Sequence, residues 1–145
     1  MSRRSAVELA RAAFGLTYLG GAVVHLVYWA SNRAVYGELT EFVLFDWYRD
    51  LWTDLVLPNL GLLLPVLAAF ELLLGVGVLS RGRIARVALA VGALFNVALA
   101  PLGFWWPSNV ALAAAQAALL RYEYAETSLA RLRGWRLRDA APRPR

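Results

Sequence analysis

Cysteine and lysine are absent from this chain, and histidine and methionine occur once each, as His25 and Met1. Without cysteine, disulfides, CxxC redox pairs, thiolate metal sites and iron–sulfur ligation by this chain are excluded. Without lysine, Schiff-base chemistry is excluded. One histidine cannot form a bis-histidine haem site, and a metal bound there would depend on remote carboxylates.

Recognisable catalytic patterns are also missing. The sequence contains no nucleophile–base pair, no phosphate-binding loop and no carboxylate dyad. It leaves open whether the protein is an enzyme, and it favours a protein with no catalytic activity of its own. We expect no metal and no resident cofactor in this chain.

Charge is scarce, at 17% of residues, whereas 60% are hydrophobic and the mean hydropathy is +0.52. A helix needs about 20 predominantly apolar residues to cross a bilayer. Helices are the only fit for segments of that length in lipid, because backbone groups must be satisfied internally. The sequence therefore predicts an all-α, polytopic four-helix membrane bundle over residues 1–128, followed by a basic tail over 129–145 whose end is disordered. The predicted spans are residues 6–29, 55–79, 84–103 and 105–124.

The sign of the charge alternates between the ends of these spans. Residues 1–11 carry three arginines and one glutamate, residues 81–86 three arginines, and residues 121–145 seven arginines against three acids. The loop at 31–54 holds two arginines and five acids. Because cytoplasmic loops are enriched in Lys and Arg, both termini are predicted to be cytoplasmic, in a multi-pass protein of the inner or plasma membrane. The basic excess then points to the lipid bilayer as a partner, and not to nucleic acid.

Two segments are predicted to be irregular. Residues 38–55 alternate polar and apolar side chains at three-to-four spacing, which predicts an amphipathic interfacial helix in the first outer loop. Pro65 predicts a bend in the second span. The fourth span is the weakest, since Pro107 and Asn109 interrupt its outer end and Arg121 its inner end.

Apart from the charged residues near the basic ends of the spans, two ionisable residues, His25 and Glu71, fall within predicted spans, where such groups are rare and costly. Counting 1.5 Å per residue from the ends of the spans places them on the order of 12 Å apart along the membrane normal, too far to touch. The same counting places Glu71 in one layer with other polar residues, with Arg11 one step below and able to reach Glu71. That layer comprises Glu71, Asn96, Tyr18 and Thr17, with Gln116 approaching from the fourth span.

Two interpretations of this predicted polar site remain open. It is either a functional site, with Glu71 as a proton-linked carboxyl or with a hydrogen-bonding pocket for a quinone or another lipid-soluble ligand, or a set of interhelical hydrogen bonds. For His25, a hydrogen bond to a carbonyl or water is favoured over haem ligation.

Two segments resemble the DoxX-like family of small four-helix membrane proteins. They are RAAFGLTYLGGAVVHL, at residues 11–26, and ELLLGVGVLSRGRIARVALAVGAL, at residues 71–94. Arg11 and Glu71 match the charged positions of the family on its first two helices. Some family members are similar to subunits of thiosulfate:quinone oxidoreductases or accompany membrane redox complexes, whereas the lack of cysteine argues against sulfur chemistry by this chain.

These observations lead to three functional hypotheses. The leading one is an accessory membrane subunit of a redox or respiratory assembly, with a quinone- or lipid-adjacent polar pocket around Glu71. The second is a small proton-coupled transporter or lipid-binding permease that acts as an oligomer. The third is a structural scaffold. The expected protein partners are other membrane subunits or further copies of the chain.

Overall fold

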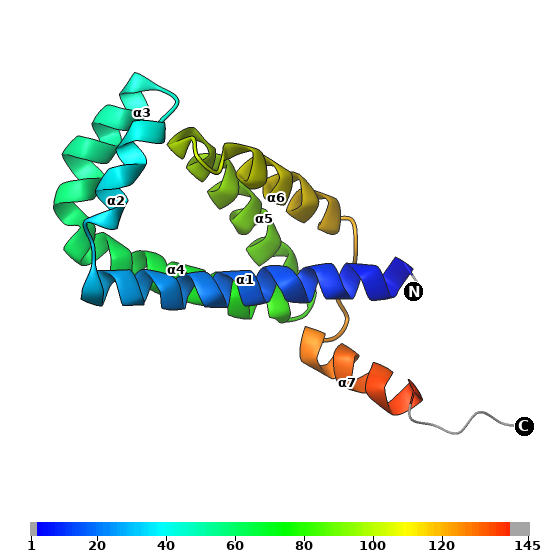
Figure 1. Cartoon of the computed structure of the whole chain (residues 1–145). Coiled ribbons are helices and arrows are strands. Elements are labelled where there is room, and N and C mark those ends of the chain that lie inside the picture. Colours follow the sequence, from blue (N-terminus) through cyan, green and yellow to red (C-terminus); the bar gives the residue numbers. More distant parts are fainter. Residues whose placement is uncertain (1–2, 140–145) are drawn as a thin grey trace, which may run out of the picture.

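The computed structural model describes residues 3–139, and these residues are helical throughout apart from short connections (Figure 1). The longer helices are α1 (Arg3–Ser31), α4 (Leu60–Leu79), α5 (Gly82–Leu99), α6 (Trp106–Leu119) and α7 (Ser128–Asp139). The shorter elements are α2 (Val35–Glu38), η1 (Leu39–Phe42), α3 (Asp46–Leu51), η2 (Trp52–Val56), η3 (Leu57–Asn59) and η4 (Ala100–Leu102). The predicted all-α class is confirmed for the described part of the chain.

Three helical stretches are long and apolar enough to cross a membrane, namely Arg3–Ser31, Asp46–Leu79 and Gly82–Leu102. The fourth predicted span is shorter than expected. Helix α6 has 14 residues, about 21 Å at 1.5 Å per residue, against a hydrocarbon core of about 30 Å. It begins with Pro107 in its first turn and ends before Arg121 and Glu123, where the chain turns.

The four longest hydrophobic helices pack side by side in the order α1, α4, α5, α6 (Figure 1). Glycines allow the close approach of α1 and α4. A Cβ on Gly75 would lie 2.9 Å from the carbonyl oxygen of Gly15, and one on Gly15 would lie 2.5 Å from Leu79 Cγ. Small residues of this kind let membrane helices pack backbone to backbone.

The segment between α1 and α4 forms a cap at one end of the molecule. The single amphipathic helix predicted over residues 38–55 needs correction, because the structure interrupts it at Val43 and Phe45, which both have extended backbone. The intervening Leu44 donates its N–H to the carbonyl oxygen of Pro101 in the distant element η4 at 3.0 Å, and not to a preceding turn of its own segment. Tyr36 and Trp52 then pack with Leu60 and Leu64 in a small apolar core.

Helix α4 continues through Pro65, and the irregular backbone lies earlier, in η2 and η3. Proline has no N–H, so the carbonyl four residues before it, that of Gly61, has no intrahelical donor. Trp29 Nε1 on α1 donates to this oxygen at 2.9 Å. A side chain of one helix thus satisfies a backbone group that the proline of another leaves free.

At the other end of the molecule, α7 follows a short connection and contacts the start of α1 (Figure 1). The sequence indicated a basic tail here, and helix α7 is an addition that the structure makes to it. The predicted disorder at the very end of the chain concerns residues 140–145, which lie outside the described residues.

Candidate functional site

Three polar centres follow one face of α1. Arg11, Tyr18 and His25 are seven residues apart, so each lies nearly two helical turns, or about 10.5 Å, from the next on the same side of the helix. All three point toward the other helices of the bundle or the cap. We refer to them as the Arg11, Tyr18 and His25 centres.

The His25 centre brings together residues of α1, α4 and the cap. His25 Nε2 lies 3.5 Å from Glu71 Oε2, and His25 Nδ1 is hydrogen-bonded to the Tyr36 hydroxyl. The Glu71 side chain is only 9% exposed, and its Oε2 atom has no hydrogen-bond partner among the described residues. The His25 ring is therefore the polar group that faces this buried oxygen, and the two side chains form an ionisable pair between α1 and α4.

Gly21 provides the space for the Glu71 carboxylate. A Cβ at position 21 would lie 2.5 Å from Glu71 Oε2, so Glu71 faces Gly21 across the α1–α4 contact. His25 is four residues further along α1, about 6 Å, a gap that the two side chains bridge. The predicted separation of about 12 Å is therefore wrong, because counting from the ends of each span ignored the register of the helix pair.

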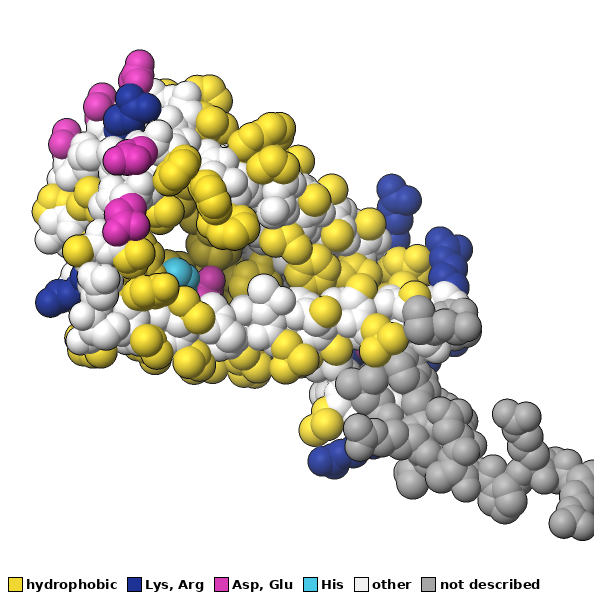
Figure 2. Space-filling model, in the orientation of Figure 1, with side chains coloured by type: hydrophobic (Ala, Val, Ile, Leu, Met, Phe, Trp, Pro, Cys, Tyr) yellow, Lys and Arg dark blue, Asp and Glu magenta, His cyan; other side chains and the backbone are white. Residues whose placement is uncertain are grey.

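The His25 centre borders an open hollow (Figure 2). The histidine, in cyan, and an acidic side chain beside it lie at the bottom of a depression on this face, between α1 and the cap. The opening is on the side of the molecule, between its two ends, and apolar side chains surround it. A ligand would therefore enter this hollow from the side of the molecule, where apolar side chains border the opening, and not from either end.

The Tyr18 centre joins three helices. The Tyr18 hydroxyl accepts hydrogen bonds from Asn96 Nδ2 at 3.0 Å and from Gln116 Nε2 at 2.7 Å. Asn96 also donates to the Gly92 carbonyl oxygen at 2.9 Å. A Cβ on Gly92 would lie 2.5 Å from the Tyr18 hydroxyl, so the glycine allows α5 to approach the tyrosine. This centre holds α1, α5 and α6 together.

The predicted single layer is therefore divided. Tyr18, Asn96 and Gln116 do meet, whereas Glu71 belongs to the His25 centre. Thr17 belongs to neither, because its exposed side chain donates to the Ala13 carbonyl oxygen of its own helix at 3.0 Å.

The Arg11 centre closes the end of the molecule that carries the N-terminus. Arg11 is fully buried and pairs with Glu8 at 2.8 Å. Its guanidinium donates to the carbonyl oxygens of Ser80 at 2.9 Å and Glu126 at 3.1 Å, and it lies 4.4 Å from the centre of the Tyr124 ring. The predicted contact with Glu71 is wrong, because Arg11 is ten residues, about 15 Å, from the level of Gly21.

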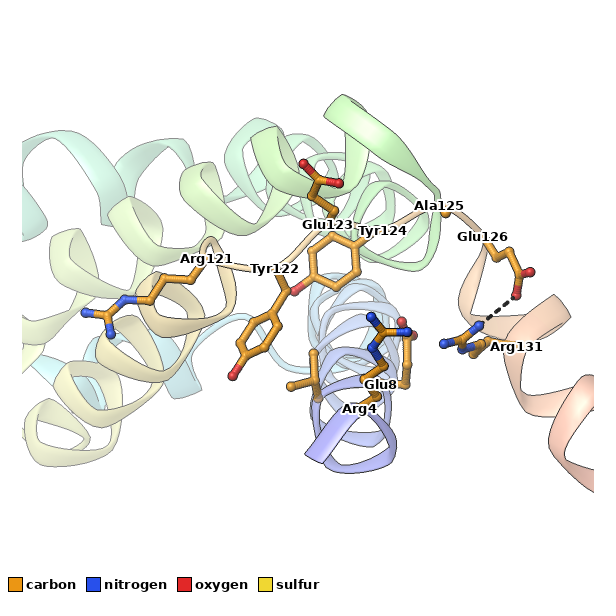
Figure 3. A pocket seen from close by; sticks show the side chains of 10 residues that line it. Arg4, Glu8, Arg121, Tyr122, Glu123, Tyr124, Ala125, Glu126 and Arg131 are labelled. Atoms are coloured by element: carbon orange, nitrogen blue, oxygen red, sulfur yellow. Dashed lines mark ion pairs between the residues drawn. The ribbon is translucent and has the colours of Figure 1, made fainter. Parts of the chain in front are cut away.

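A charged cavity of about 370 Å³ lies beside the Arg11 centre (Figure 3). It is bounded by the first turns of α1, the 121–126 segment and the start of α7, and Arg131 pairs across it with Glu126 at 3.5 Å. Its lining carries equal numbers of arginines and glutamates, namely Arg4, Arg121, Arg131, Glu8, Glu123 and Glu126.

Two tyrosines outside the long spans stay protonated well above neutral pH. Burial is the main cause that raises the pKa of Tyr36 to about 12, with the Glu71 charge as a smaller cause. Burial likewise raises the pKa of Tyr124 to about 12, against the opposing effect of Arg11. A protonated Tyr36 can donate to His25 Nδ1, which leaves the proton of a neutral imidazole on Nε2, facing Glu71.

No protein-family model, curated protein or solved structure matches this chain. The resemblance to DoxX-like proteins therefore stays a prediction.

The chemistry available at the three centres differs. The Tyr18 and Arg11 centres join several elements through hydrogen bonds and ion pairs, as structural contacts do. Among residues 3–139, no group of three metal-ligating side chains comes together. The His25 centre combines an imidazole, a carboxylate 3.5 Å from it and an open hollow beside the histidine, which suits a ligand with carbonyl or hydroxyl groups.

Proposed function

We propose that this protein is an integral membrane accessory subunit of a redox assembly, and that its His25 centre receives a lipid-soluble ligand with polar groups, such as a quinone. The observation that carries the proposal is the His25–Glu71 pair, two ionisable side chains 3.5 Å apart between long apolar helices, with the histidine at the bottom of the hollow in Figure 2. Intramembrane ionisable residues usually serve function.

The residues of this centre fit a quinone. Its carbonyl oxygens would accept from His25 Nε2–H, its hydroxyl groups in the reduced form would donate to Glu71, and Tyr36 would hold the imidazole in that tautomer. A bound quinone would supply electron and proton transport within the lipid phase. The chain itself provides the orientation, the proton-accepting carboxylate and the exclusion of bulk water.

We also propose the arrangement in the membrane. The four helices α1, α4, α5 and α6 form the membrane domain, with both termini and the Arg11 centre on the cytoplasmic side. This arrangement is supported by the basic residues of that end and the acidic residues of the cap, which follow the positive-inside rule. The hollow then opens sideways into the lipid.

The test of the ligand site is Glu71→Leu, measured in the purified protein with the reduced quinone ubiquinol-1 as the probe and tryptophan fluorescence as the readout. We expect affinity to fall at least tenfold, because the substitution removes the group that would accept from the hydroxyl groups of the ligand, and a thermal unfolding curve checks that the variant is folded. Glu38→Leu, at an exposed position of the cap, is the control. Equal quinone binding by Glu71→Leu and the unaltered protein would show that the site is elsewhere.

The accessory-subunit role has its own test. Purification from native membranes in a mild detergent, followed by mass spectrometry, should recover larger redox polypeptides in stoichiometric amounts. Recovery of this chain alone, or only with further copies of itself, would contradict the role and leave the ligand site unaffected.

One observation favours the transporter as the second candidate. The titratable side chains of His25 and Glu71 lie 3.5 Å apart beside the hollow, as a proton-coupled site requires. Proteoliposomes separate the two candidates, because a transporter moves protons under an imposed pH gradient, and Glu71→Gln should abolish that flux.

A further inference from the structure

An apolar groove runs along the contact between α4 and α5, away from the His25 centre. Its volume is about 460 Å³. Its walls are exposed or partly exposed apolar side chains such as Leu73, Val87 and Val91, and Arg83 stands at one end. Val91 is eight residues from Arg83, about 12 Å along α5. That length is close to half of the hydrocarbon core, which is the depth of one lipid leaflet.

A second cavity, of about 250 Å³, adjoins the groove at Arg83. It is formed by the start of α5 and the 123–125 segment, and its charged residues are Arg83, Arg86 and Glu123. The two arginines form no ion pair with any described residue. The cavity therefore carries a net positive charge that no group in the described chain neutralises.

The walls of this cavity are held in place by the fold. Gly82 donates its N–H to the Tyr124 carbonyl oxygen at 2.6 Å, and the Tyr124 hydroxyl donates to the Leu119 carbonyl oxygen at 2.8 Å. The 121–126 segment is also fixed by the bond from Arg11 to the Glu126 carbonyl oxygen. The cavity is thus preorganised, and Tyr124, which remains neutral, adds no negative charge to it.

We propose that the groove and the adjoining cavity together bind one anionic phospholipid. Its phosphate lies between Arg83 and Arg86, and one acyl chain follows the α4–α5 groove. An apolar channel of leaflet depth that ends at two unpaired arginines matches a phospholipid in both polarity and length, and basic pockets between membrane helices bind anionic headgroups. This inference goes beyond the proposed function and uses none of the residues of the His25 centre.

Native mass spectrometry of the full chain in mild detergent, titrated with phosphatidylglycerol, tests the proposal. Arg83→Gln and Arg86→Gln should each weaken binding about fivefold, the equivalent of about 1 kcal/mol per basic side chain near anionic lipid. Arg33→Gln, which removes the same charge at the opposite end, should leave binding unchanged.

One further variant and one matched pair distinguish a built site from general attraction. Glu123→Gln should strengthen phosphatidylglycerol binding severalfold, since it removes the opposing charge, and a merely damaged fold would not produce that gain. Val87→Trp fills the groove and should weaken binding, whereas Val66→Trp, at an exposed position of α4 outside it, should not.

Three results would overturn the proposal. They are equal binding of phosphatidylcholine and phosphatidylglycerol, equal weakening by Arg33→Gln and the two cavity arginine variants, or no effect of Val87→Trp. Each would indicate ordinary surrounding lipid. None of them would bear on quinone binding at the His25 centre.

Discussion

Gly20 and Gly21 are neighbours on α1 with different surroundings, and they provide a matched test of the His25 centre. A Cβ on Gly21 would lie 2.5 Å from Glu71 Oε2, whereas one on Gly20 would meet nothing within 4 Å. We expect Gly21→Ala to displace Glu71 and to lower the free energy of unfolding by about 1–3 kcal/mol, as overpacking does. Gly20→Ala should be neutral or stabilising by up to about 1 kcal/mol, because alanine favours the helix. Unfolding in mixed micelles measures both, and equal effects would contradict the placement of Glu71.

Tyr18 provides a second test at the scale of one residue. Tyr18→Phe removes the acceptor shared by Asn96 and Gln116, and Gln116 Nε2 loses the only hydrogen bond that it makes in the described chain. We expect the free energy of unfolding to fall by about 1–2 kcal/mol, since hydrogen bonds between membrane helices contribute modestly and one buried amide is left unpaired. Tyr28→Phe keeps the ring that packs against Tyr36 and removes only the hydroxyl of a partly exposed side chain, so it should lower the free energy of unfolding by less than about 0.5 kcal/mol. A Tyr18→Phe variant as stable as the unaltered protein would show that this centre does not hold the helices together.

The sequence indicated which polar side chains lie inside better than it indicated which of them meet. Arg11, Tyr18, Glu71, Asn96 and Gln116 are buried, as expected for polar groups that avoid lipid. Their partners depend on the register of α1 against α4, and a count from the ends of apolar stretches does not contain that register. The seven-residue spacing of Arg11, Tyr18 and His25 was an available signal that these three share one face.

Among the elements, α1 and α4 are linked by the bond from Trp29 Nε1 to the Gly61 carbonyl oxygen, which Pro65 leaves without a donor. Trp29→Phe should therefore lower the free energy of unfolding by about 1 kcal/mol, in addition to the effect of the smaller ring. In a Pro65→Ala background the N–H of residue 65 can donate to the Gly61 carbonyl oxygen within the helix, so Trp29→Phe should lower the free energy of unfolding by less. A double-mutant cycle of unfolding free energies measures this coupling, and a coupling of zero would mean that the bond does not compensate for the proline.

The cap is held to α1 by Tyr36, which predicts a dependence on alkaline pH. The pKa of Tyr36 rises from 10.0 to about 12 on folding, mainly through burial, and the groups that face it are His25, Glu71 and Tyr28. Below pH 10 both states keep the proton. Between pH 10 and about 12 the unfolded chain loses it first, so stability falls as pH rises. Tyr36→Phe should make this fall less steep in thermal unfolding followed at a series of pH values, and an unchanged slope would contradict the burial of the hydroxyl.

The long helices were predictable at the level of elements, because their apolar runs exceed what a span requires. The interruption at Val43–Phe45 was not, because it depends on the distant acceptor Pro101. Helix α7 was not predicted either, for a different reason. Its sequence is strongly polar, with no apolar periodicity of the kind that marks a buried helix.

For the whole molecule, the question is whether the chain crosses the membrane three or four times. Three stretches are long enough, and α6 is about 9 Å shorter than the core when 14 residues rise 1.5 Å each. The Tyr18 centre nevertheless fixes α6 against α1 and α5 in the interior. A short helix can cross if the bilayer thins locally or if flanking residues complete the path, at a modest cost. The charge pattern favours this fourth crossing, because it returns the basic tail to the basic side.

The absence of native cysteine makes that arrangement directly measurable. Asp50→Cys in the cap and Arg133→Cys in α7 place single thiols at exposed positions near the two ends of the molecule. With four crossings and cytoplasmic termini, an impermeant maleimide should label Asp50→Cys in intact cells and Arg133→Cys only after permeabilisation. With three crossings, the cap and α7 would lie on the same side and both thiols would react alike. Labelling of Arg133→Cys alone in intact cells would instead invert the orientation, and the headgroup cavity at Arg83 would then face the outer leaflet.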